Sequence, residues 1–137
     1  MLYLQELVKQ EQQTQKITII ERLPLFLSTP CLLDVTYRVV LQDDYYLIHL
    51  GVTGTLHVVC QRCMNEFIHS YENHTVIAVC RSDERAERLL EHYECIVSSS
   101  WQVDLEALII DELHLYAPQF HPNLDDCGDE INRILQT

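Results

Sequence analysis

Residues that interrupt regular structure are scarce in this sequence: 137 residues include only three glycines and four prolines. This scarcity argues against a linker-rich or low-complexity chain, and a hydrophobic content of 47% is enough to fill one core. No run approaches the roughly 18 consecutive apolar residues of a membrane span, and the N-terminus lacks the charge and apolar pattern of a signal peptide. We therefore expect a single domain over residues 1–137, a cytoplasmic location and no membrane partner.

Positive charge is scarce as well. The chain carries 9 Lys and Arg against 21 Asp and Glu, a formal net charge of −12. The imbalance is strongest in residues 81–137, where 13 acidic side chains stand against four basic ones. Tight binding to bare nucleic acid requires clustered Lys and Arg, so the composition disfavours it. A basic protein partner suits this charge better, and the alternative is that the excess acid only keeps the chain in solution.

The first 30 residues predict a helix followed by a connector. Residues 3–14 place Leu4, Leu7 and Val8 on one helical face, which is the spacing of an amphipathic helix. The segment after it, residues 16–20, is rich in β-branched residues and predicts a short strand.

Residues 31–80 predict an antiparallel sheet. Apolar and polar residues alternate over residues 31–40, as they do in a half-buried strand. Residues 45–50 predict a second strand, Gly51 and Gly54 predict a break, and further strands follow up to residue 80. Short connections between consecutive strands favour a meander, because parallel neighbours need long crossovers.

The pattern changes to a helical part over residues 81–117. Ser82 is a suitable N-cap, with Asp83 in the first turn, and Asp104 is a suitable N-cap for a second helix that Pro118 ends. A loop-like tail follows over residues 118–137. Strands followed by helices predict an α+β fold in which the helices pack on one face of the sheet.

Six cysteines are present, and in the cytosol they are expected to be reduced thiols or metal ligands instead of disulfides. Cys31, Cys80 and Cys95 lie in apolar surroundings and are expected to be ordinary buried thiols.

Cys60 and Cys63 form a Cys-x-x-Cys pair that leaves three interpretations open. The pair can be half of a structural zinc site, which needs four ligands, and His121 and Cys127 in the tail are the candidates for the other half. A redox pair is the second interpretation, although such pairs usually lie at a helix N-terminus. The third is a turn without chemistry.

Motifs of catalysis are missing from the sequence: there is no G-x-S-x-G, no glycine-rich phosphate loop and no H-E-x-x-H. The seven histidines are scattered, and Asp104, Glu106, Asp111 and Glu112 do not all share one helical face. We expect these carboxylates to be solvated and the protein not to be an enzyme.

Two segments resemble a known family. The stretch "CQRCMNEF" at residues 60–67, together with "CRSDERAERLLEHYECIV" and "VDLEALIIDELHLYAP" further on, is similar to the YceD-like proteins, the large ribosomal RNA subunit accumulation proteins. The resemblance covers roughly residues 55–128. The matching positions are Cys60, Gln61, Arg62, Cys63, Phe67, Arg81, Ser82, Asp83, Asp104, Leu105, Glu112 and Pro118. Some relatives carry more cysteines in the tail, where this chain has only Cys127.

The resemblance implies a non-enzymatic factor that supports the accumulation of large-subunit (23S) ribosomal RNA. Its partner would be ribosomal RNA or, as the charge favours, a basic large-subunit ribosomal protein or assembly factor. Arg62 is the best candidate for a local RNA contact, and it is expected to lie near Arg38 on another strand. A small thiol- or metal-dependent protein that uses Cys60 and Cys63 is the alternative.

Overall fold

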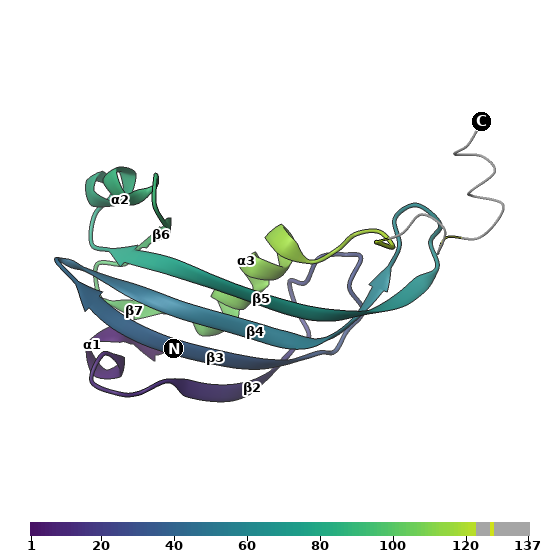
Figure 1. The fold of residues 1–137 in the computed structure, drawn as a ribbon, viewed down its shortest axis with the longest axis horizontal. Helices are drawn as coiled ribbons and strands as arrows, with labels where there is room; N and C mark the ends of the chain where they lie inside the picture. Colours follow the sequence, from purple (N-terminus) through teal and green to yellow (C-terminus); the bar gives the residue numbers. More distant parts are fainter. Residues whose placement is uncertain (123–126, 128–137) are drawn as a thin grey trace.

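The computed structural model describes residues 1–122 and Cys127. A twisted five-stranded sheet with the order β2-β3-β4-β5-β6 dominates the fold, and a two-stranded sheet pairs β1 with β7 (Figure 1). The strands are β1 (Leu2–Tyr3), β2 (Gln13–Ile19), β3 (Cys31–Gln42), β4 (Tyr45–Val59), β5 (Glu66–Cys80), β6 (Glu94–Val97) and β7 (Gln102–Val103). The helices are α1 (Leu4–Leu7), α2 (Asp83–Leu89) and α3 (Leu105–Tyr116). The predicted α+β class is confirmed.

The two longer helices begin where their caps predict. The hydroxyl of Ser82 accepts a hydrogen bond from the backbone N–H of Arg85 (3.3 Å), and the carboxylate of Asp104 accepts one from Ala107 (3.3 Å). Each bond satisfies an N–H group that has no partner within its helix. None of the helices in residues 1–122 combines the length and the apolar character that a membrane-spanning helix needs.

Helix α3 packs on one face of the sheet and completes the main core. Ile109 and Leu113 are fully buried there, together with Val35 and Ile48 of the central strands. Helix α2 covers one end of the opposite face, where Ala86 and Leu89 pack with Tyr45, Leu47, Ala78 and Cys80, so the helices do not all pack on one face as expected. Because successive side chains of a strand point to opposite faces, Leu47 and Ile48 belong to these two different clusters.

The expected N-terminal helix over residues 3–14 is wrong beyond its first turn. Helix α1 ends at Leu7, and the chain enters β2 at Gln13. β2 pairs with β3 in antiparallel register from Gln13↔Tyr37 to Ile19↔Cys31. Sheet pairing with a long, well-buried neighbour outweighs the weak local preference for helix, so the sheet begins at residue 13 and not at residue 31.

The expected break at Gly51 and Gly54 is also wrong, because β4 runs without interruption through both. A Cβ atom at Gly51 would lie 2.7 Å from Thr36 Oγ1, and one at Gly54 would lie 2.8 Å from the carbonyl oxygen of Leu32. These glycines therefore allow adjacent strands to approach closely, which is a role of glycine inside strands.

β6 runs parallel to β5, from Ile77↔Glu94 to Cys80↔Val97. The chain reverses through α2 between the two strands, and a crossover of this kind is what parallel pairing requires. The sheet is therefore mostly, but not entirely, antiparallel.

Candidate metal centre

The structure brings together all four residues of the predicted metal site. Their ligand atoms, the sulfurs of Cys60, Cys63 and Cys127 and a ring nitrogen of His121, all lie within 4.8 Å of one another. Cys60, His121 and Cys127 are buried, and Cys63 is partly buried. The cluster lies where β4 turns into β5 and the chain after α3 returns to that hairpin, at the opposite end of the long sheet from α2 (Figure 1).

A tight turn places the first two sulfurs. The backbone N–H of Met64 donates to the carbonyl oxygen of Cys60 (2.7 Å), and the N–H of Cys60 donates to the carbonyl oxygen of Asn65 (2.9 Å). Met64 has φ 61°, a left-handed backbone conformation that residues other than glycine adopt only occasionally. This closed turn directs the side chains of Cys60 and Cys63 toward a common point.

The second half of the cluster is held to this turn by several contacts. The backbone N–H of Gln61 donates to the carbonyl oxygen of Gln119 (2.9 Å). Arg62 donates from Nη2 to the carbonyl oxygen of His121, and its guanidinium lies 5.2 Å from the ring centre of Phe120, within cation–π range. The ring of Phe67 stacks on that of His121, with 4.4 Å between their centres. These contacts fix the position of His121 against the hairpin.

Three distances between these ligand atoms are close to those of a tetrahedral zinc site. With Zn–S bonds of about 2.3 Å and a Zn–N bond of about 2.0 Å, a tetrahedral site places two sulfurs about 3.8 Å apart and a sulfur and a nitrogen about 3.5 Å apart. The sulfurs of Cys60 and Cys127 lie 3.8 Å apart. Nδ1 of His121 lies 3.5 Å from the sulfur of Cys63 and 3.6 Å from that of Cys127.

The cluster holds one thiol ready to ionise. Burial alone would raise the pKa of Cys60, but hydrogen bonds from the backbone N–H groups of Cys63, His121 and Arg62 outweigh it and lower the pKa to about 5. Burial and the neighbouring cysteines raise the pKa of Cys127 to about 11. A bound cation favours the thiolate form of every cysteine ligand, so it would offset the burial and the neighbouring cysteines that keep Cys127 protonated.

The other predicted site residues divide into two groups. Gln61, Arg62 and Phe67 surround the metal centre. Ser82 and Asp104 instead cap helices, Asp83 lies exposed in the first turn of α2, and the guanidinium of Arg81 lies 5.8 Å from the ring centre of Trp101.

The expectation that Arg38 lies near Arg62 is wrong. Arg62 is partly buried and its guanidinium bonds to the chain itself. In the register of β3 with β4, Arg38 lies opposite His49, ten residues before β4 ends at Val59. At about 3.3 Å per residue, this places Arg38 on the order of 30 Å from the hairpin, so the two guanidinium groups do not act together.

Glu112 was expected to be solvated, and this is wrong: the side chain is buried between α3 and the sheet, 1% exposed. Asn73 donates from Nδ2 to one of its carboxylate oxygens (2.8 Å). Burial and the neighbouring carboxylate of Glu94 raise the pKa of Glu112 to about 7. Its position three residues after Ile109 and four after Leu108, both buried, is the signal in the sequence that would have found it.

Neither a protein-family model nor a solved structure matches this chain.

Proposed function

We propose that the protein is a non-enzymatic factor of large-subunit ribosome biogenesis that supports the accumulation of 23S ribosomal RNA. In this proposal one zinc ion, bound by Cys60, Cys63, His121 and Cys127, has a structural role. The observation that carries the binding role is the set of four protein ligands whose donor atoms all lie within 4.8 Å of one another. Four protein ligands leave no open position for a substrate or a water, which is the pattern of structural zinc and not of catalytic zinc.

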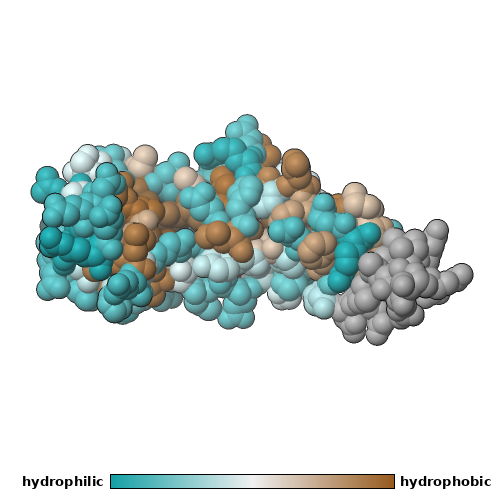
Figure 2. Space-filling view, turned by 90° about the horizontal axis from the view of Figure 1, so that it is seen from above, coloured by the Kyte–Doolittle hydropathy of each residue, from teal (hydrophilic) through white to brown (hydrophobic). Residues whose placement is uncertain are grey.

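The ribosomal part of the proposal rests on the sequence. "CQRC" and the downstream segments are similar to the YceD-like family, and the charge indicates the kind of partner. At the α2 end, exposed Asp83, Glu84 and Glu87 lie beside exposed Arg81 and Arg88, and Figure 2 shows a mainly hydrophilic surface at that end of the molecule. The charge argument therefore rests on the chain as a whole: a net charge of −12 attracts a basic ribosomal protein or assembly factor more strongly than it attracts RNA.

The zinc part is tested by metal analysis of the purified chain. We expect one zinc per chain, and we expect loss of that zinc in the double variant Cys60→Ser/Cys63→Ser. Cys95→Ser is the matched control, since Cys95 is a partly buried thiol outside the cluster. A metal-free wild-type chain that cannot be loaded with zinc would contradict this part.

The partner is tested by a pull-down from a cell extract with and without nuclease. We expect a basic large-subunit ribosomal protein or assembly factor that stays bound after nuclease treatment. Tight binding of a large-subunit rRNA fragment at physiological salt, without any ribosomal protein, would show that the contact is to RNA. Recovery of no ribosomal component at all would contradict the ribosomal role.

A thiol-dependent redox function is the second candidate, and the lowered pKa of Cys60 favours it because a thiolate is the reactive form. It requires a reversible disulfide between Cys60 and Cys63. Slow alkylation of both thiols in zinc-loaded protein supports the structural site, whereas zinc-independent, reversible oxidation of the pair supports the redox function.

A further inference from the structure

β2 is the edge strand of the five-stranded sheet. Within residues 1–122 and Cys127 only β3 pairs with it, so in this part of the chain its outer edge is free for pairing. Its seven residues match seven residues of β3 one to one, without a bulge. Proteins commonly protect such edges with proline, bulges or several charges, but β2 contains only one charged residue, Lys16, and no proline.

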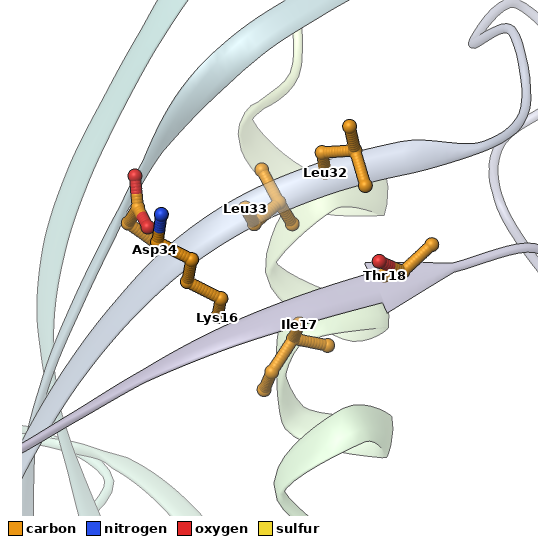
Figure 3. A pocket seen from close by; sticks show the side chains of 6 residues that line it. All are labelled: Lys16, Ile17, Thr18, Leu32, Leu33 and Asp34. Carbon is orange, nitrogen blue, oxygen red and sulfur yellow. The ribbon is translucent and has the colours of Figure 1, made fainter.

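A hollow of about 280 Å³ lies between β2 and β3 at this edge. Figure 3 shows Lys16 and Asp34 together at one end of it, with Thr18 and Leu32 further along the two strands. The side chain of Leu32 is 63% exposed. A small apolar side chain placed beside Thr18 would cover part of this leucine.

A second hollow, of about 370 Å³, lies between β2 and the start of α3. Gln15 and Ile17 line it from β2, and Asp104 and Glu106 are the charged side chains that line it. A lysine or arginine fits such a place, because its apolar stem can cover Ile17 while its charged end meets the carboxylates.

We propose that the free edge of β2 binds an extended segment of a basic protein by β-strand addition. The backbone of that segment pairs with β2, and its side chains alternate between the two faces, as in other cases of strand addition. Lysine or arginine lies toward Asp104 and Glu106, and small apolar side chains lie toward Thr18 and Leu32. The inference rests on the proposed function only for the ribosomal identity of this basic partner.

The probe is an acetylated and amidated nine-residue peptide that alternates valine and lysine, with a valine–glutamate peptide as its control. We expect the lysine peptide alone to bind and to slow hydrogen exchange in residues 13–19. Glu106→Lys is expected to weaken its binding about tenfold, and Glu87→Lys on α2 serves as the matched control.

Two proline variants test the backbone pairing. Successive N–H groups of a strand point to opposite sides, so one of Thr14→Pro and Gln15→Pro removes an N–H group at the free edge and the other breaks the pairing with β3. The variant that keeps the thermal midpoint of the wild type identifies the free side, and we expect it to lose peptide binding at least tenfold. If both variants unfold, the hydrogen exchange of residues 13–19 and the peptide affinity of Glu106→Lys decide whether the peptide binds at β2.

Several outcomes would overturn the inference. The stable proline variant could bind the peptide as well as the wild type does, or hydrogen exchange could slow outside β2 instead of within it. The glutamate peptide could bind as tightly as the lysine peptide, or the chain could form a dimer through β2 that excludes the peptide. Failure here is separate from failure of the proposed function. If the stable proline variant still retains a ribosomal partner, only the proposed strand addition at β2 is refuted. If the peptide binds but no ribosomal partner is recovered from the extract, only the ribosomal role is refuted.

Discussion

Arg62 donates a hydrogen bond from its guanidinium to the backbone carbonyl oxygen of His121, 59 residues away in the sequence. One of the two residues between the cysteines of the hairpin therefore holds the ligand that arrives from the chain after α3. Groups that orient a metal ligand without touching the metal tune its affinity, so Arg62 is expected to act as a positioning residue of the metal centre.

Replacement of this arginine should weaken metal binding without removing a ligand. We expect Arg62→Met to lower zinc affinity by about ten- to a hundredfold while the Cys₃His coordination is kept. Competition with a chromophoric chelator measures the affinity, and the spectrum of the cobalt-substituted protein reports the ligand set. Arg38→Met, a change at an exposed arginine on β3, is the control. Equal affinities of the two variants would remove Arg62 from this role.

Removal of the metal should loosen one end of the molecule. A zinc concentration of about 1,000 times Kd stabilises the folded state by about 4 kcal/mol, and chelation is expected to remove that stabilisation. Hydrogen exchange should then accelerate in residues 58–67, where the hairpin depends on the cluster, and remain unchanged in the pairing of β2 with β3. Uniform acceleration over the whole sheet would instead show that the metal supports the entire fold.

The two glycines of β4 should differ in how well they tolerate alanine. At Gly54 the new Cβ would lie 2.8 Å from the carbonyl oxygen of Leu32, a backbone atom that cannot rotate away. At Gly51 it would meet the side chains of Thr36 and His74, which can move. We expect Gly54→Ala to lower the free energy of unfolding by about 1–3 kcal/mol and Gly51→Ala to lower it less, as measured by urea unfolding. A larger loss at Gly51 would contradict this comparison.

The buried carboxyl of Glu112 should make stability depend on pH. Its folded-state pKa, about 7, lies above the ordinary value of 4.5, so the folded state holds the proton more tightly than the unfolded state does. The contribution is complete below pH 4.5 and is lost as pH rises toward and through 7.

Replacement by the neutral amide should remove this dependence. We expect Glu112→Gln to be more stable than the wild type at pH 8.5, by on the order of 2 kcal/mol, and to differ less at pH 5. Urea unfolding at both values measures the change. Glu106→Gln, at an exposed carboxylate on the same helix, should show no such effect. A difference between Glu112→Gln and wild type that is the same at both values would contradict the assignment.

Local features were predictable because they depend on neighbours in the sequence. The N-caps Ser82 and Asp104 were found because capping is decided within three or four residues. The strand over residues 31–40 was found because alternation is a property of one segment. The prediction of a helix over residues 3–14 was wrong for the opposite reason. Gln13–Ile19 becomes a strand because it pairs with β3, and this partner is distant in the sequence and does not enter a local preference.

The sequence alone determined the chemistry that is available at the hairpin: two cysteines two residues apart, candidate partners in the tail, and an acidic chain around them. Only the tertiary structure decided that His121 and Cys127 reach Cys60 and Cys63, because nearly 60 residues of sheet and helix separate them and their approach depends on where α3 ends over β5. It also decided that Gly51 and Gly54 lie within a continuous strand and that Glu112 is buried, since both follow from the distance between packed elements and not from the order of residues.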